Sequence, residues 1–356
     1  MSQVANNESV ERRGGRALLL NDTLRRIGQI TFSVALTMVG LLAITFVIGR
    51  VMPVDPVLAV VGERASNEVY EAARKAMGLD RPLIVQFGLY LRDVFSGDLG
   101  VSTLTARPVS ADIARVFPAT LELATIATLI GTLLGIPAGV LAAVYKGRLI
   151  DQVIRVIGLF GYSMPIFWLG LMGLLVFYGI LGWVAGPGRI DVYYDGIVPT
   201  ITGLILIDSL IAGETEIFYN AFSHIILPAS ILGYYSLAYI SRMTRSFMLE
   251  QLGQEYITTA RVKGLSEMTV IWRHAVRNVM VPLITVVALS YANLLEGSVL
   301  TEVIFSWPGI GSYITTALLS ADMAAVLGGT IVVGAVFVGI NLLSDVLYKV
   351  VDPRAR

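Results

Sequence analysis

Long apolar runs alternate with polar segments along the whole chain. Residues 27–49 carry no charge and are long enough to cross the roughly 30 Å hydrocarbon core of a bilayer. This run is too long for a cleavable signal peptide, and no small-residue cleavage site follows it. Similar runs predict spans near residues 27–51, 119–145, 153–185, 225–247, 279–305 and 323–350, with interruptions at Pro165 and Pro228. The pattern predicts an all-α, polytopic membrane protein with six transmembrane helices.

Lysine and arginine gather in every second connection between these runs. They occur in the N-terminal arm, around residues 146–155 and 242–277, and in the C-terminal tail, whereas the segment between the third and fourth spans is acidic. Because positive loops stay inside, both termini are expected to be cytoplasmic. The expected organisation is a cytoplasmic arm at 1–26, a first span with an extracytoplasmic segment at 27–118, a five-helix core at 119–350 with a cytoplasmic loop at 250–280, and a cytoplasmic tail at 351–356.

The extracytoplasmic segment predicts two short amphipathic helices. The first is "NEVYEAARKAMGLDRP", ended by Gly78 and stopped by Pro82, and the second is "LIVQFGLYLRDVFSG". We expect both helices to lie along the outer membrane surface. A cap over the spans and a docking surface are equally good interpretations of them.

The polar loop "EYITTARVKGLSEMTVIWRHAVRN", residues 255–278, separates the fourth and fifth spans. Ser266 can cap a helix in its second half, and Gly264 can end a helix in its first half. The second helix would place one apolar face at Met268, Ile271, Trp272, Ala275, Val276 and Val279. This helix–glycine–helix loop could lie on anionic lipid, or it could act as a rigid lever in a groove on a cytoplasmic partner.

Composition excludes several classes of function. The chain has 55% hydrophobic and 15% charged residues with a net charge of +0, which favours the lipid bilayer and disfavours a nucleic-acid partner. It has no cysteine and two histidines, His224 and His274, so no metal site and no catalytic residue is expected. The dipeptide Gly-Lys does not occur, so a Walker A phosphate loop is absent. Any nucleotide must therefore be hydrolysed by another chain.

Several motifs resemble one known family. "TTARVKG" followed by "HAVRN" and "VP" is similar to the cytoplasmic loop of ABC-importer permeases, with Thr258 and Thr259 in place of the Glu-Ala of the general pattern and Pro282 as the matched proline. The dipeptide, oligopeptide and nickel permease family is resembled by "MGLDRP" (77–82), "GDLGVS" (97–102), "RPV" (107–109), "PATLELA" (118–124), "EVIFSWPGIG" (302–311) and "DPR" (352–354). The resemblance runs from the first span to the last residues and implies a MetI-like, type I importer permease core.

The resemblance also implies partners and a substrate class. It implies a subunit of the bacterial cytoplasmic (inner) membrane that moves peptides and binds no cofactor itself. Expected partners are a homologous second permease, two ABC ATPases that hold ATP and magnesium, and an extracytoplasmic peptide-binding protein. The residues implied in ATPase coupling are Thr259, Ala260, Arg261, Gly264, His274, Arg277 and Asn278. Nickel or another peptide-like solute is the alternative cargo.

Carboxylates within or at the ends of spans mark a candidate translocation path, because an ionised group in lipid needs water or a partner. They are Glu122, Glu296 and Glu302. Glu302 could meet a substrate ammonium, or it could hold the turn that contains Trp307 and Pro308 at the outer mouth. Glu296 replaces the small residue usual in the family, and it could tune selectivity or be idle.

Two other classes of function compete with the importer. A secondary transporter would also have buried carboxylates, but it would need neither the cytoplasmic lever nor nucleotide. An intramembrane hydrolase is disfavoured, because both histidines lie at or beyond the ends of predicted spans.

Overall fold

The computed structural model describes residues 28–29, 31–49, 56–62 and 64–351. Within these ranges the regular structure is helical, apart from one isolated bridge between Val101 and Pro108. The expected all-α class is confirmed. The N-terminal arm, 1–26, and nearly all of the tail, 352–356, lie outside the described residues.

Five helices of the described chain are long and apolar enough to cross a membrane. They are Thr31–Gly49, α5 (Val109–Val144), α9 (Thr215–Leu252), the continuous helix Glu267–Gly297 and α15 (Met323–Val351). A sixth candidate is a pair bent by 99°, formed by α6 (Leu149–Ser163) and by α7 (Ile166–Gly173) with its π-helical continuation η1 (Leu174–Ile180). The expectation of six spans is met when this pair counts as one.

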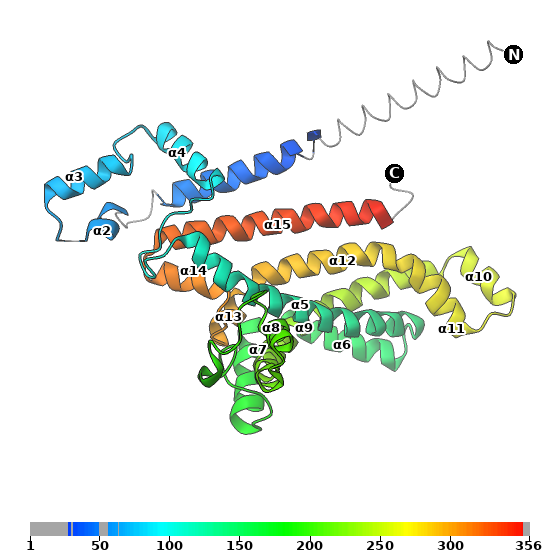
Figure 1. The fold of residues 1–356 in the computed structure, drawn as a ribbon. Coiled ribbons are helices and arrows are strands. Elements are labelled where there is room, and N and C mark those ends of the chain that lie inside the picture. Colours follow the sequence, from blue (N-terminus) through cyan, green and yellow to red (C-terminus); the bar gives the residue numbers. More distant parts are fainter. Residues whose placement is uncertain (1–27, 30, 50–55, 63, 352–356) are drawn as a thin grey trace, which may run out of the picture.

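Two prolines expected to interrupt spans behave differently. At Pro165 the prediction is confirmed: Met164 adopts extended backbone, as residues before proline prefer, and α7 turns away from the bundle in Figure 1. At Pro228 the prediction is wrong, because α9 runs through it without a break. Pro228 is buried between packed neighbours, whereas Pro165 is exposed. Packing on all sides thus keeps α9 helical.

Several expected span ends are also wrong. α5 begins at Val109, ten residues before the predicted start at 119, and the fifth span begins at Glu267 and stops at Gly297. This span is built from α11 (Glu267–Thr269), the π-helical η3 (Val270–Ala275) and α12 (Val276–Gly297), and α13 (Val299–Ile304) is a separate helix beyond it. Hydropathy identifies the residues that suit lipid, but a helix can begin before them. α5 begins in the polar residues before 119, and the fifth span begins in the polar residues before 279.

Close packing of α5 on α9 forms the centre of the bundle. Gly131, Gly135 and Gly139 repeat every four residues along one face of α5 and lie against Ser236, Ile240 and Thr244 of α9. Small residues at this spacing let two backbones approach closely. α12 and α15 pack on the same core, and Leu41 of the first helix contacts α15 at Gly334.

Short helices gather at the two ends of the bundle (Figure 1). α2 (Pro56–Val61), α3 (Asn67–Ala76) and α4 (Leu83–Phe95) lie at one end, and α10 (Glu255–Val262) lies with α11 at the other. α3 and α4 confirm the two predicted amphipathic helices, with Ser66 as the N-cap of α3 and Gly78 at φ +67 after its end. The remaining short helices are η2 (Val192–Tyr194), α8 (Ile205–Ala212) and α14 (Ile310–Leu319).

Candidate functional site

The loop between α9 and α12 forms the predicted helix–glycine–helix. α10 ends at Val262, and Gly264 follows with φ +76, a left-handed conformation that favours glycine. The Ser266 hydroxyl accepts a hydrogen bond from the Thr269 N–H at 3.4 Å and so caps α11. The Arg261 guanidinium donates to both Glu267 oxygens, at 2.9 and 3.2 Å, and this ion pair bridges the turn.

One face of the loop is part of the bundle core. Ile257 and Ala260 of α10 and Val270 and Ala275 of η3 are buried together with core residues of α5, α9 and α12. Met248 of α9, fully buried, belongs to the same cluster. The loop is therefore packed onto the spans on either side of it, and it does not hang from them as a free linker.

The opposite face of the loop is exposed. Of the seven coupling candidates, five are exposed, His274 is half-buried and Ala260 faces the core. The five exposed candidates are Thr259, Arg261, Gly264, Arg277 and Asn278. Val262 is 83% exposed and Met268 67% exposed. The loop thus presents apolar side chains next to arginines on the face that points away from the core.

The predicted apolar face of the second helix is only half correct. Ala275, Val276 and Val279 are buried as expected, but Met268 and Trp272 are exposed, and Val270 is buried in their place. The cause is the π-helical turn η3, which contains one more residue per turn than an α-helix and rotates everything before it. The α-helical spacing of apolar residues in the sequence does not predict such an insertion.

At the other end of the α5–α9 pair, Glu302 of α13 is fully buried and fixes the turn that follows it. Its carboxylate accepts hydrogen bonds from Thr120 Oγ1 at 2.7 Å, Ser298 Oγ at 2.9 Å and the Ser312 N–H at 3.0 Å. Burial raises the pKa of Glu302, although these hydrogen bonds oppose the rise. Gly309 lies against the carboxylate so closely that a Cβ would collide with it. Glu302 and the turn are thus built as one unit.

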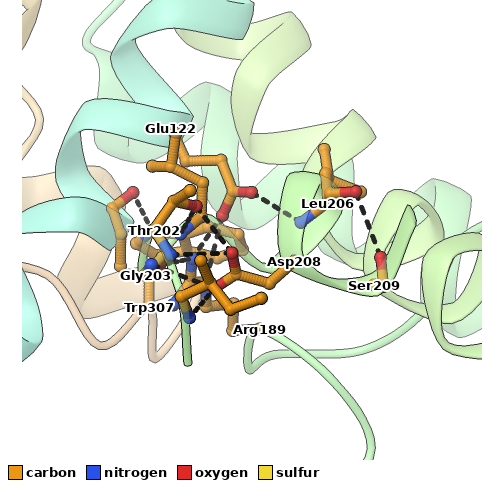
Figure 2. Close-up of polar contacts among 11 residues, drawn as sticks. Glu122, Arg189, Thr202, Gly203, Leu206, Asp208, Ser209 and Trp307 are labelled. Carbon is orange, nitrogen blue, oxygen red and sulfur yellow. Dashed lines mark hydrogen bonds and ion pairs between the residues drawn. The ribbon is translucent and has the colours of Figure 1, made fainter. Parts of the chain in front are cut away.

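Figure 2 shows a second buried carboxylate, Glu122 of α5, beside this turn. Arg189 donates to Glu122 Oε2 at 2.5 Å from Nη2 and to the Gly203 carbonyl at 2.7 Å, and the Leu206 N–H donates to Glu122 Oε1 at 2.8 Å. The Arg189 guanidinium also lies 5.9 Å from the centre of the buried Trp307 ring. Glu122 therefore ties Arg189 and the first turn of α8 to α5.

Asp208 of α8 organises the same segment (Figure 2). It accepts from the Thr202 hydroxyl at 2.7 Å and from the N–H groups of Ile201, Thr202 and Gly203 at 2.8–3.2 Å. Burial alone would raise the pKa of Asp208, but these hydrogen bonds prevail and hold that pKa below its ordinary value. Trp307 in turn donates from Nε1 to the Ala119 carbonyl at 2.8 Å.

The five translocation-path candidates fall into two groups. Glu122, Glu302 and Trp307 are buried close to one another, whereas Glu296 and Pro308 are exposed. In the described part of the chain, no group of three or more His, Cys, Asp or Glu side chains is placed to hold a metal ion. Whether the candidates line a path stays a prediction.

Sequence reasoning missed the partners of these carboxylates. Arg189 and Asp208 lie in the acidic segment between the third and fourth predicted spans, where the sequence assigns neither of them a partner. A third pair was missed as well: Arg245 of α9 donates to Asp151 of α6 at 2.7 and 2.9 Å. The only signal in the sequence was a charge at the edge of an apolar run, which marks the need for a partner without identifying it.

Comparisons with known proteins place the chain in a family. Residues 135–356 match the family model described as "Binding-protein-dependent transport system inner membrane component", and residues 23–124 match the model of its N-terminal part. The chain is 44% identical to a probable D,D-dipeptide transport system permease protein of Escherichia coli K12, over 92% of this chain and 96% of the relative. It is also 44% identical to the dipeptide transport system permease protein of the same strain, over 95% and 99%.

A solved structure shares the fold. A chain of the MetNI methionine ABC transporter, in an inward-facing form, matches with a TM-score of 0.51 and 16% identity, covering 68% of this chain and 96% of its own length. At this identity the likeness concerns the fold alone, and it confirms the expected MetI-like core. The chain belongs to the family of binding-protein-dependent transport system inner membrane components and is a permease subunit of the inner membrane.

Proposed function

We propose that this chain is the dipeptide-conducting permease of an ABC importer whose ATPases are separate polypeptides. Two relatives that cover almost the whole chain are named for D,D-dipeptide and dipeptide transport. The observation that carries the proposal is the loop at residues 255–278, which is packed on the core at one face and exposed at the other. Such a loop has the form required to pass the motion of a partner to the spans.

The mechanism follows from how the loop is built. Arg261 and Glu267 clamp the glycine turn, so that α10 and α11 move as one body. Ile257 and Val270 connect that body to α9 and α12 through the shared core. Binding of the exposed Val262 and Met268 in a groove of an ATPase couples its closure to displacement of both spans. The seven coupling candidates act in this unit, Ala260 by packing and the exposed ones by contact.

The proposed assembly contains a second, homologous permease, two ATPases with ATP and magnesium, and a peptide-binding protein on the extracytoplasmic side. The loop and both termini face the cytoplasm in this arrangement, in keeping with the arginines around the loop. The end that carries Glu122, Glu302 and Trp307 then faces outward. We assign Glu302 to holding the outer turn, because its oxygens already accept three hydrogen bonds from the protein.

Uptake into proteoliposomes tests the function. The assembled transporter with its binding protein is expected to accumulate a labelled dipeptide when ATP is supplied to the ATPases, and to stop when ATP is omitted. Uptake driven by a proton or sodium gradient alone would make the chain part of a secondary transporter. ATP-driven uptake of nickel but not of dipeptides would keep the importer and reject the proposed cargo.

Substitution at Gly264 tests the lever. A side chain meets nothing within 4 Å there, so the effect of Gly264→Leu arises from its positive φ, which costs an L-residue about 1–2 kcal/mol, and from bulk on the exposed face. We expect Gly264→Leu to keep assembly and ATP hydrolysis but to lose most dipeptide uptake per ATP. Gly264→Asn is the matched control, because Asn tolerates this conformation. A normal uptake-to-hydrolysis ratio in Gly264→Leu would count against the lever.

A further inference from the structure

A pocket of about 480 Å³ opens between α6 and the last part of α9, which leads into the loop. Its volume is in the range of pockets that hold small ligands. Its lining includes Arg155, Leu159 and Tyr162 of α6 and Arg242 and Arg245 of α9. Neither the coupling loop nor the buried carboxylates of the other end contribute to it.

The pocket carries an excess of positive charge. Arg245 is paired with Asp151, and Arg155 lies 3.5 Å from the same carboxylate. Arg242 lies over the rings of Tyr162 and Tyr239, at 5.2 and 5.9 Å from their centres. Among the described residues no carboxylate lies within 4.0 Å of the Arg242 guanidinium. Two of the three guanidinium groups therefore share one carboxylate and the third has none, so the site is prepared for an anion.

The position of Arg242 along α9 indicates how deep this residue lies in the membrane. Residues 217–241 contain no Asp, Glu, Lys or Arg. At 1.5 Å per residue this stretch is roughly 37 Å long, more than the roughly 30 Å of a hydrocarbon core. Arg242 follows it directly and so lies where the apolar part of the span ends. Phosphate groups of lipids occupy that depth, and basic pockets between helices there bind acidic headgroups.

We infer that this pocket binds a phospholipid with a net negative headgroup. The lipid phosphate would pair with Arg242 and Arg155, and its acyl chains would run toward the middle of the spans over the 65% exposed Leu159 and past Tyr162. A zwitterionic peptide fits less well, because the pocket lining contains no Asp or Glu to receive an ammonium group. The inference concerns a site apart from the coupling loop and does not rest on the proposed cargo.

Lipid binding to the assembled transporter, measured by native mass spectrometry, tests the inference. Dioleoylphosphatidylglycerol is compared with dioleoylphosphatidylcholine, which has the same chains and no net charge. We expect phosphatidylglycerol to bind more tightly, and the double variant Arg155→Gln, Arg242→Gln to weaken its binding by about 25-fold, near five-fold for each arginine. The double variant Arg74→Gln, Arg92→Gln, on α3 and α4 with side chains 45% and 78% exposed, is the control with the same charge change and should bind as the wild type does.

Three results would overturn the inference. Equal binding of the two lipids would show that charge does not select the ligand. An undiminished preference in the double variant, with its melting temperature unchanged, would place the lipid elsewhere. Displacement of phosphatidylglycerol by glycerol 3-phosphate or by a dipeptide, at concentrations comparable to that of the lipid, would assign the pocket to a free anion or to the substrate.

Discussion

Buried carboxylates at the end of the bundle away from the loop each hold a different stretch of backbone. Glu122 binds the Leu206 N–H, Asp208 binds the N–H groups of residues 201–203, and Glu302 binds the Ser312 N–H. The sequence indicated Glu122 and Glu302, because a charge in or beside an apolar run requires an explanation. It could not indicate Arg189, which meets Glu122 only through a fold that brings together residues 67 positions apart.

Substitution of Glu302 distinguishes a structural role of this side chain from a role in contacting the transported substrate. Glu302→Ala removes the acceptor of three donors, two of them buried hydroxyls, and leaves a cavity, so we expect it to lower the free energy of unfolding by about 2–4 kcal/mol. Glu302→Gln should cost less, because its amide can accept from Ser312 and donate to the hydroxyls. Glu296→Ala, at an exposed position, is the control. Thermal unfolding of the purified protein gives the stabilities. Normal stability with abolished uptake in Glu302→Gln would instead indicate a substrate contact.

The lowered pKa of Asp208 predicts how the stability of the folded protein depends on pH. Because its pKa is lowered in the folded protein from the ordinary value of 3.8, its ionised form stabilises the fold above that value, and the contribution is lost as the pH falls through the folded pKa. Asp208→Asn should therefore melt at a lower temperature than the wild type at pH 7, with a difference that shrinks as the pH falls below about 4. A difference that does not change with pH would contradict the role of the charge.

At the scale of helices, the sequence predicted which helices exist better than it predicted where each one begins and ends. The amphipathic helices α3 and α4 and the helix–glycine–helix loop follow from caps, glycines and apolar spacing, all of which are local. The starts of α5 and of the fifth span were missed because these helices begin in polar sequence before the apolar run, and the end of the fifth span was missed because its helix stops at Gly297, inside the apolar run. The continuity of α9 at Pro228 and the π-helical turn η3 depend on tertiary packing, which no local pattern reports.

The α5–α9 contact leads to a prediction at this scale. A Cβ on Gly139 would lie 2.5 Å from the Ser241 carbonyl oxygen and from Thr244 Cβ, so Gly139→Leu must push the two helices apart. We expect a loss of about 3 kcal/mol or more, seen as a lower melting temperature and poorer recovery of the purified protein. Gly40→Leu, in the first span with nothing within 4 Å, is the matched control. Equal stability of the two variants would show that the contact is looser than described.

For the whole molecule, the sequence predicted the class, the number of spans with the bent pair counted as one, and the family. The arrangement of parts came only from the structure. The loop is packed on the central pair of spans at one end, and the buried carboxylates hold the other end. One continuous helix, α9, follows α8, which carries Asp208, and reaches to the loop. A displacement of the loop can therefore be transmitted along α9 to the other end of the bundle.

Contact between the loop and an ATPase tests this account most directly. The chain contains no cysteine, so an introduced one is its only thiol and can carry a photoreactive maleimide. Val262→Cys places the probe on the loop, at a position 83% exposed, and Val192→Cys places it on η2, at a position 91% exposed. In the assembled transporter we predict that the probe at 262 forms an adduct with an ATPase subunit and that the probe at 192 does not. Adducts of the probe at 262 with lipid alone would contradict the account.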